Sequence, residues 1–249
     1  MKNGASDILL DVRGLEIRYG AATAVRGVDL QVRRGELVAV IGNNGAGKTS
    51  ILRGISGLVR PQAGTVMFKG EDTASFAAYK KVDRGLALIP EGRLIFADQT
   101  VEDNLILGAY SRWNSQRKAV LAEFEEMFAL FPRLKERLHQ RAGSLSGGEQ
   151  QMLAMARGLL SKPDLLMIDE MSLGLAPKIV EQLMTLLRDL NAKGQTILLV
   201  EQLASHALAI AHRAYVVGHG KIELEGPAQT LAGSPAVMET FLGKKRNPH

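Results

Sequence analysis

Apolar and polar residues alternate along the first part of the chain and then give way to continuous apolar runs. Residues 7–19 and 28–34 alternate, which is typical of half-buried antiparallel strands. Residues 37–41 are apolar without interruption, as in a strand that is buried on both faces of a parallel sheet. The segments 65–68 and 85–89 predict two further short strands. The first third of the chain is therefore predicted to contribute to both kinds of sheet.

The periodicity becomes helical after about residue 100. Residues 101–113 predict one helix, and residues 115–140 carry apolar side chains at helical spacing. Pro132 interrupts the second segment, so two helices are expected there rather than one. Another helix is predicted over residues 148–161. Strands at 165–168 and 196–200, helices at 177–191 and 204–212, and a hairpin around 218–220 complete the pattern.

This order of elements predicts an α/β fold with an insertion. Segments 1–92 and 161–243 would form a core around a parallel sheet, and the N-terminal part would add an antiparallel β subdomain. The segment 93–160 would be inserted into that core as a helical subdomain. Residues 244–249 would form a basic tail.

Composition narrows the class of protein. Of the 249 residues, 46% are hydrophobic and 23% are charged, as expected of a folded chain with a substantial core. The apolar runs are shorter than the roughly 20 residues that span a bilayer, and the N-terminus lacks the pattern of a signal peptide. Because there is no cysteine, disulfides and thiolate chemistry are excluded and a reducing cytosol is indicated. The net charge is +5, but the basic residues are scattered, so nucleic acid is not expected as a partner.

The candidate chemistry begins directly after the apolar run that ends at residue 41. The loop GNNGAGKT matches the phosphate-binding pattern GxxxxGK[ST], and a helix is predicted after it over residues 49–58. Glycines let backbone N–H groups form an anion-binding nest, and the helix N-terminus adds its positive end. Lys48 would reach the β- and γ-phosphates of ATP, and the Thr49 hydroxyl would ligate Mg²⁺. The predicted nucleotide-binding set is Gly42, Asn43, Asn44, Gly45, Ala46, Gly47, Lys48, Thr49 and Ser50.

An acidic pair follows the strand predicted over residues 165–168. In open α/β sheets ligands bind at the carboxyl ends of the strands, which is where Asp169 and Glu170 would lie. Asp169 would hold Mg²⁺, directly or through water, and Glu170 would polarise the attacking water as general base. Acids after a strand also serve as helix N-caps, but the upstream phosphate loop favours a Walker B pair. The two motifs predict an α/β fold of the P-loop NTPase (RecA-like) type that binds and hydrolyses ATP.

A third motif, LSGGEQQ at residues 145–151, opens the helix predicted at 148–161. A Ser-Gly-Gly sequence before a helix is physically another anion-binding N-terminus. Its spelling and its place ahead of the acidic pair match the signature motif of ABC transporters. The chain resembles the nucleotide-binding subunits of that family over nearly its whole length. The resemblance implies a head-to-tail dimer in which Ser146, Gly147 and Gly148 contact the γ-phosphate of ATP bound to the opposite subunit, with Glu149 in the same nucleotide-binding set.

The resemblance also assigns roles to two segments that the residues alone leave open. Tyr19 stands where the family places its adenine-stacking aromatic, although an isolated tyrosine there is more often a half-buried sheet residue. Residues 172–177, SLGLAP, resemble the D-loop, which runs along the dimer interface in that family.

Several positions depart from the family pattern. Glu91 replaces the usual glutamine of the Q-loop; a carboxylate can ligate Mg²⁺ but adds negative charge beside the phosphates. Gln202 replaces the switch histidine, and it can hydrogen-bond a γ-phosphate without carrying a proton. We therefore assign Glu170 and Gln202 to hydrolysis. Met171 stands where proline is usual, and His206 is expected on the surface of the next helix.

The segments PEGR, VEQ and the closing FLG make the chain similar to the LivF branch, the second ATPases of branched-chain amino-acid importers. This implies a peripheral ATPase on the cytoplasmic face of the membrane, working with transmembrane permeases and indirectly with a periplasmic or extracellular binding protein. Its ATPase partner would be LivG-like or a second copy of itself. The permease would meet the chain near residues 91–101 and the helical insertion.

Other functions fit parts of the pattern. The ATPase of a urea or amide importer has similar motif spacing. A soluble ABC ATPase outside transport usually carries long insertions or tandem domains, for which 249 residues leave no room. The glutamine at position 202 keeps open a nucleotide-binding scaffold with little turnover.

Overall fold

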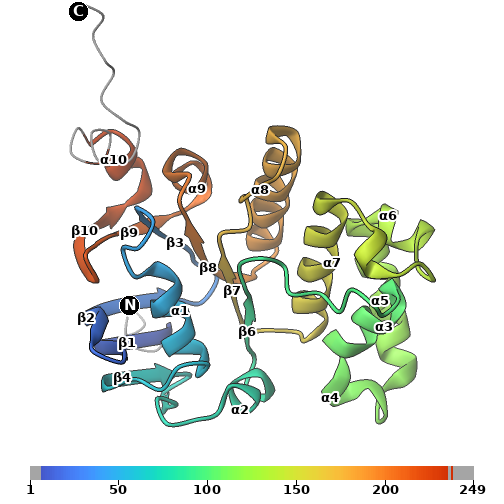
Figure 1. The fold of residues 1–249 in the computed structure, drawn as a ribbon, viewed down its shortest axis with the longest axis horizontal. Helices are drawn as coiled ribbons and strands as arrows, with labels where there is room; N and C mark the ends of the chain where they lie inside the picture. The colour runs from blue at the N-terminus through green and yellow to red at the C-terminus, as the bar shows by residue number, and fades with distance from the viewer. Residues whose placement is uncertain (1–6, 235–236, 238–249) are drawn as a thin grey trace, which may run out of the picture.

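The computed structural model describes residues 7–234 and 237, and in them the predicted α/β fold is confirmed. Figure 1 shows the two sheets with their helices on one side of the molecule and the helices between residues 101 and 160 gathered on the other. The predicted basic tail, 244–249, lies outside the described residues, as does the end of the predicted core, 238–243.

The N-terminal part of the chain forms an antiparallel sheet of four strands. Its strands, in spatial order, are β2 (Ala22–Arg33), β1 (Ile8–Tyr19), β4 (Ala63–Phe68) and β5 (Glu71–Asp72). The alternation of apolar and polar residues in the sequence corresponds to an alternation of buried and exposed side chains, since one face of β1 packs inward and the other meets solvent. β4 and β5 extend this sheet, so it is not built by the N-terminus alone.

A second sheet of six strands forms the centre of the core. In spatial order it contains β10 (Lys221–Pro227), β9 (Arg213–Gly218), β3 (Leu37–Gly42), β8 (Thr196–Glu201), β7 (Leu165–Asp169) and β6 (Leu86–Ile89). Every neighbouring pair is parallel except β10 with β9. The carboxyl ends of the parallel strands therefore meet at one edge.

Side chains of the six-stranded sheet enter two separate cores. On β3, Val38 and Val40 pack in the core shared with the antiparallel sheet and α1 (Lys48–Ser56). Ala39 and Ile41 face the opposite core, beneath the helices. Both faces are buried, which is why the sequence of this strand is continuously apolar.

The helices divide between the core and the insertion. The core helices besides α1 are α2 (Ala78–Asp83), α8 (Pro177–Ala192), α9 (Ala204–Ile210) and α10 (Ala228–Ala232). The insertion contains α3 (Val101–Gly108), α4 (Tyr110–Trp113), α5 (Arg117–Leu130), α6 (Pro132–Glu136), a 3₁₀ turn (Ala142–Ser144) and α7 (Gly147–Leu160). None of the helices in the described residues is long and apolar enough to cross a membrane.

Two details differ from the sequence prediction. The segment 101–113 is two helices, because the backbone of Ala109 leaves the helical region at φ −103° and ψ 17°. Just before that break, a Cβ on Gly108 would lie 2.5 Å from the carbonyl oxygen of Arg157, so α3 and α7 are in close backbone contact there. The short elements β5, α2 and α10 are also absent from the sequence prediction. The predicted break at Pro132 is confirmed, with α5 ending at Leu130.

A buried ion pair joins three parts of the insertion. Glu123 of α5 is 5% exposed, and both of its carboxylate oxygens accept hydrogen bonds from Arg112 of α4, at 2.8 and 2.7 Å. Arg112 also donates to the carbonyl oxygen of Leu160 at the end of α7. The Arg112 guanidinium holds the pKa of Glu123 below its ordinary value. The pair therefore fastens α4, α5 and α7 together.

We expect Arg112→Met to destabilise the protein by about 3 kcal/mol, because it leaves a buried carboxylate with only Lys162 as cationic partner. Urea denaturation followed by circular dichroism measures this loss. Lys135→Met is the matched control. Lys135 of α6 pairs at the surface with Glu125 of α5, the helix that also carries Glu123, and this exposed pair should contribute little to stability. Equal effects of the two substitutions would contradict a special role for the buried pair.

Candidate nucleotide site

The predicted chemical residues meet at the carboxyl edge of the six-stranded sheet. Ile41 of β3 is paired with Glu201 of β8, and Asp169 of β7 with Val200. The phosphate loop, the acidic pair and Gln202 therefore leave neighbouring strands at the same level. This edge is where open α/β sheets bind their ligands.

The phosphate loop has the backbone geometry of an anion nest. Gly45 and Gly47 have φ values of +77° and +106°, which only glycine adopts without strain. Gly47 is also the N-cap of α1 and makes no side-chain cap, so the first N–H groups of the helix are left for a ligand. The loop is held from outside by Gly220 of the β9–β10 hairpin, whose N–H donates to the carbonyl oxygen of Ala46.

Lys48 is buried at the centre of the site. Its side chain is 3% exposed, and its Nζ lies 2.9 Å from Glu170 Oε1. The same Nζ donates to the carbonyl oxygens of Gly42 and Asn43 at 2.9 and 3.2 Å. The cation predicted to meet phosphate and the carboxylate predicted to activate water thus lie side by side.

The two groups predicted to hold Mg²⁺ are also in contact. The Thr49 hydroxyl donates to Asp169 Oδ1 at 3.1 Å. Burial, together with the charges of Glu170 and Glu91, raises the pKa of Asp169 to about 6 against the opposing hydrogen bond from Thr49. Hydroxyl and carboxylate oxygens are the donors that Mg²⁺ prefers, so this part of the site fits the predicted ion.

Glu170 has an unusual backbone conformation. Its φ is +44°, a region that non-glycine residues rarely occupy and that costs about 1 kcal/mol or more. Its N–H donates to the carbonyl oxygen of Val200 at 2.9 Å, which continues the β7–β8 ladder by one step. Strain of this kind at a catalytic candidate marks a position that its surroundings fix.

The remaining predicted residues lie around this centre. Gln202 is exposed and directly follows β8, and Glu91 is exposed beyond β6, close enough for its charge to act on Asp169. Tyr19 is 42% exposed at the end of β1. Its hairpin partner β2 reaches the phosphate loop, where Ala24 lies against Gly47. His206 lies on α9 and is half-buried, whereas the sequence predicts an exposed position on the surface of that helix.

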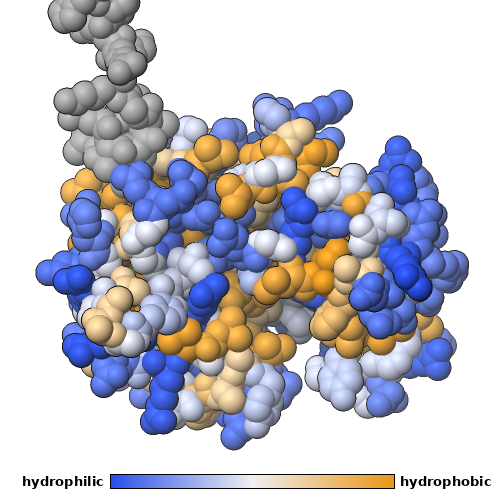
Figure 2. Space-filling view, viewed as in Figure 1, coloured by the Kyte–Doolittle hydropathy of each residue, from blue (hydrophilic) through white to orange (hydrophobic). Residues whose placement is uncertain are grey.

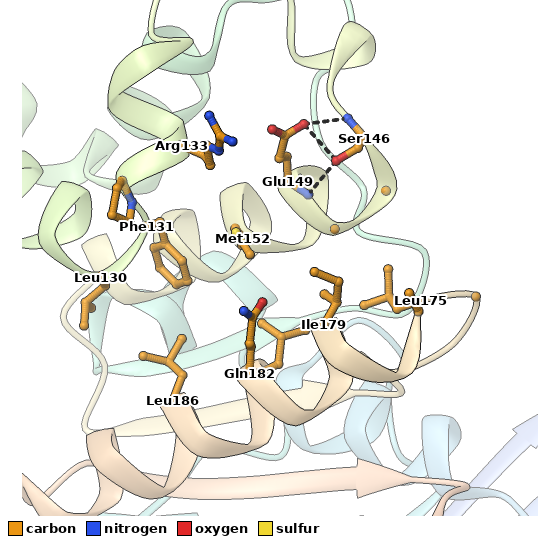
Figure 3. Close-up of a pocket in the computed structure, with 16 residues that line it drawn as sticks. Leu130, Phe131, Arg133, Ser146, Glu149, Met152, Leu175, Ile179, Gln182 and Leu186 are labelled. Atoms are coloured by element: carbon orange, nitrogen blue, oxygen red, sulfur yellow. Dashed lines mark hydrogen bonds between the residues drawn. The ribbon is translucent and has the colours of Figure 1, made fainter.

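The signature segment does not join this centre within the same chain. In Figure 1, α7 stands apart from α1, with β7 and α8 between them. Ser146 caps α7 by accepting from Glu149 N–H, while the Glu149 carboxylate accepts from Ser146 N–H and Oγ. Figure 3 shows this capping box at one end of a largely apolar cleft of about 760 Å³ between α7 and α8. The Ser-Gly-Gly turn at the start of α7 therefore lies apart from the chain's own phosphate loop on α1.

The loop after β6 is fastened to the signature helix. Arg93 donates to Gln150 Oε1 at 3.1 Å, and Arg157 donates to the carbonyl oxygen of Leu94 at 2.8 Å. The backbone between these contacts has positive φ at Gly92, Arg93 and Leu94. The sequence pattern PEGR indicates no role for Arg93, because nothing in it shows that the partner of Arg93 lies 57 residues away.

Comparison with known proteins identifies the family. The ABC transporter family matches residues 25–172. BraG of Pseudomonas aeruginosa, a high-affinity branched-chain amino acid transport ATP-binding protein, is 41% identical over 225 residues, covering 90% of this chain and 95% of BraG. The chain belongs to the ABC transporter family. A probable LivF of Archaeoglobus fulgidus, a branched-chain amino acid transport ATP-binding protein, is 36% identical over 82% of this chain and 86% of its own.

The fold agrees with that membership. A crystal structure of an ATP-binding cassette of an ABC transporter in its ADP conformation has a TM-score of 0.80 and 25% identity, covering 95% of this chain and 99% of the other. The predicted resemblance to ABC transporter subunits of the LivF type is confirmed, and the chain is an ABC-type ATPase.

We expect Gly47→Ala to abolish nucleotide binding by this ABC ATPase. A Cβ at Gly47 would lie 2.6 Å from the carbonyl oxygen of Ala24, and the positive φ would disappear on relaxation. Gly20→Ala is the matched control, since Gly20 also has positive φ but a Cβ there meets nothing within 4 Å. It should cost about 1 kcal/mol of stability and leave binding of a fluorescent ATP analogue unchanged. Retained binding in Gly47→Ala would contradict the anion-nest assignment.

Proposed function

We propose that this chain hydrolyses ATP to energise the import of branched-chain amino acids through partner permeases. The observation that carries the proposal is the convergence of Lys48, Thr49, Asp169 and Glu170 at one sheet edge, in a chain of this family. The substrate class is supported by the printed functions of the relatives that cover most of the chain. The site would lie at the cytoplasmic face of the membrane, against the permease.

Each residue at the edge has a task in hydrolysis. The nest N–H groups and Lys48 bind the β- and γ-phosphates, and Tyr19 stacks on adenine. Thr49 and Asp169 would hold Mg²⁺, with Glu91 as a further oxygen ligand, and the ion would neutralise part of the phosphate charge. Glu170 accepts a proton from the attacking water. Gln202 hydrogen-bonds the γ-phosphate but cannot relay a proton, so Glu170 itself passes the proton on to the phosphate product or to solvent.

The site needs a second subunit for completion. The signature turn of Ser146, Gly147 and Gly148 lies away from its own phosphate loop, and its capping box leaves N–H groups at the start of α7 facing outward. In a head-to-tail dimer these groups would meet the γ-phosphate held by the other chain. Glu149 serves this contact indirectly, because its carboxylate orients Ser146. The partner is a LivG-like ATPase or a second copy of this chain.

We expect Lys48→Ala and Glu170→Gln to separate binding from turnover. Lys48→Ala removes the phosphate cation and should weaken ATP binding strongly. Glu170→Gln removes the general base and should retain binding while lowering kcat by about a hundredfold or more. Steady-state phosphate release and equilibrium binding of a fluorescent ATP analogue measure the two effects. Near wild-type turnover in either variant would remove the assigned role.

A permease-docking surface is formed beside the site by exposed apolar side chains. A cleft of about 680 Å³ lies between α2, β6, α7 and the loop after β6. Tyr110 is 75% exposed at its rim, and Leu58, Leu94 and Phe96 are also exposed there. Figure 2 shows hydrophobic residues around a notch between the parts that carry α2 and α4. Exposed apolar patches of this kind mark protein interfaces, and this one includes the predicted contact region 91–101.

We expect Tyr110→Asp to prevent assembly with the permease subunits while leaving the ATPase activity of the free chain intact. The change places a charge in the apolar surface without touching the nucleotide site. Leu224→Asp is the matched control, because Leu224 is exposed on β10, outside both the cleft and the helical insertion. Two measurements provide the readouts: copurification with candidate permease subunits, and ATP-driven uptake of labelled leucine into proteoliposomes. Uptake of urea instead of leucine would overturn the substrate assignment.

A further inference from the structure

Glu201 is a buried acid that the proposed chemistry does not use. It ends β8, immediately before Gln202, and its exposed fraction is 0%. Among the described residues it forms no ion pair with a basic side chain, and burial raises the pKa of its carboxyl group. Burying an unpaired carboxyl group costs several kcal/mol unless hydrogen bonds compensate it. The place of Glu201 in the fold therefore calls for a specific partner.

That partner is Ser172. Its hydroxyl donates to Glu201 Oε2 at 2.6 Å, and its backbone N–H donates to Glu201 Oε1 at 3.2 Å. Ser172 is itself only 7% exposed. The two bonds together form a clasp between the end of β8 and the chain that leaves β7, and they fix both the position and the orientation of Ser172.

The clasp controls the turn that carries Glu170. Ser172 lies two positions beyond Glu170, whose own N–H is bonded to Val200. The turn is therefore fastened to β8 on both sides of the strained residue, by Val200 before it and by Glu201 after it. A left-handed conformation at a glutamate persists only when its surroundings impose it. Without the second attachment, the Glu170 backbone could relax and its carboxylate would point elsewhere.

We propose that Glu201 is a positioning residue for ATP hydrolysis, which holds Glu170 in its reactive orientation through the clasp on Ser172. The inference rests on the proposed role of Glu170 as general base. Ser172 is also the first residue of the segment 172–177, so the clasp fixes the position of the start of that segment beside Glu170. Glu201 does not contact the phosphates; it acts through Ser172. Ser172 and Glu201 should then affect the rate of hydrolysis and not the binding of ATP.

The test compares Glu201→Gln, Ser172→Ala and Ser172→Thr in the full chain. Glu201→Gln keeps the volume but replaces one acceptor oxygen by a donor, and Ser172→Ala removes the hydroxyl. Each should lower kcat about tenfold while the KM for ATP and the affinity for a fluorescent ATP analogue stay within about twofold, since the lost interaction acts in the transition state. Ser172→Thr retains the hydroxyl and should recover most of the rate.

A control on the same strand separates positioning from stability. Thr196 is buried at the opposite end of β8, where its hydroxyl accepts from Gly35 N–H. Thr196→Val should lower the melting temperature without lowering kcat. The double variant Ser172→Ala with Glu201→Gln should be no slower than the slower single variant, because both break one clasp.

The outcomes are decisive in either direction. Unchanged kcat in Ser172→Ala, or losses that follow the melting temperature as in Thr196→Val, would overturn the inference. A rise in KM with unchanged kcat would overturn it as well. If Glu201→Gln does not fold, the contrast between Ser172→Ala and Ser172→Thr decides alone. Wild-type turnover and its loss in Glu170→Gln, measured in parallel, report on the proposed function independently of the clasp.

Discussion

The six-stranded sheet is covered on both faces, by the antiparallel sheet and α1 on one side and by helices on the other, and this confines all chemistry to its rim. Within β3, β7 and β8 no position is open to solvent, so their middles are apolar. Polar side chains appear only at the ends of these strands, at Thr196 where β8 begins and at Asp169 and Glu201 where β7 and β8 end, or in the loops beyond. The same covering holds the strand ends in a fixed register, which places groups from distant parts of the sequence within hydrogen-bond distance.

Electrostatics at that rim are unbalanced. Lys48 contacts Glu170, while Asp169 and Glu91 add negative charge nearby; burial, and after it the charges of Glu170 and Glu91, raise the pKa of Asp169. Such an excess of carboxylates is unfavourable until cations are bound, and it suits a site that takes a nucleotide together with a divalent ion. The nest of N–H groups at the start of α1 supplies the opposite potential a short distance away. The rim thus combines an anion-attracting half with a cation-attracting half.

The sequence predicted what local patterns encode and missed what depends on tertiary contacts. The buried strands, the phosphate loop and the break at Pro132 follow from periodicity, glycine placement and the missing proline N–H. The division at Ala109 directly follows Gly108, but the close contact of Gly108 with Arg157 is not visible in the sequence. The clasp of Glu201 on Ser172 joins residues 29 positions apart, and the motif VEQ by itself indicates a role only for Gln202. Contacts of this kind become visible only when strand order and register are known.

The attachment of the loop after β6 to α7 has a mechanical consequence. Arg93 and Arg157 hold that loop at two levels of the helix, and its three successive left-handed residues leave little slack in the chain. Leu94, whose carbonyl oxygen accepts the hydrogen bond from Arg157, and the nearby Phe96 are both exposed at the cleft. A displacement of these side chains would therefore be passed to α7 through the two arginine hydrogen bonds. Communication between the cleft and the signature turn at the start of α7 would then require no unfolding, only a small tilt of α7.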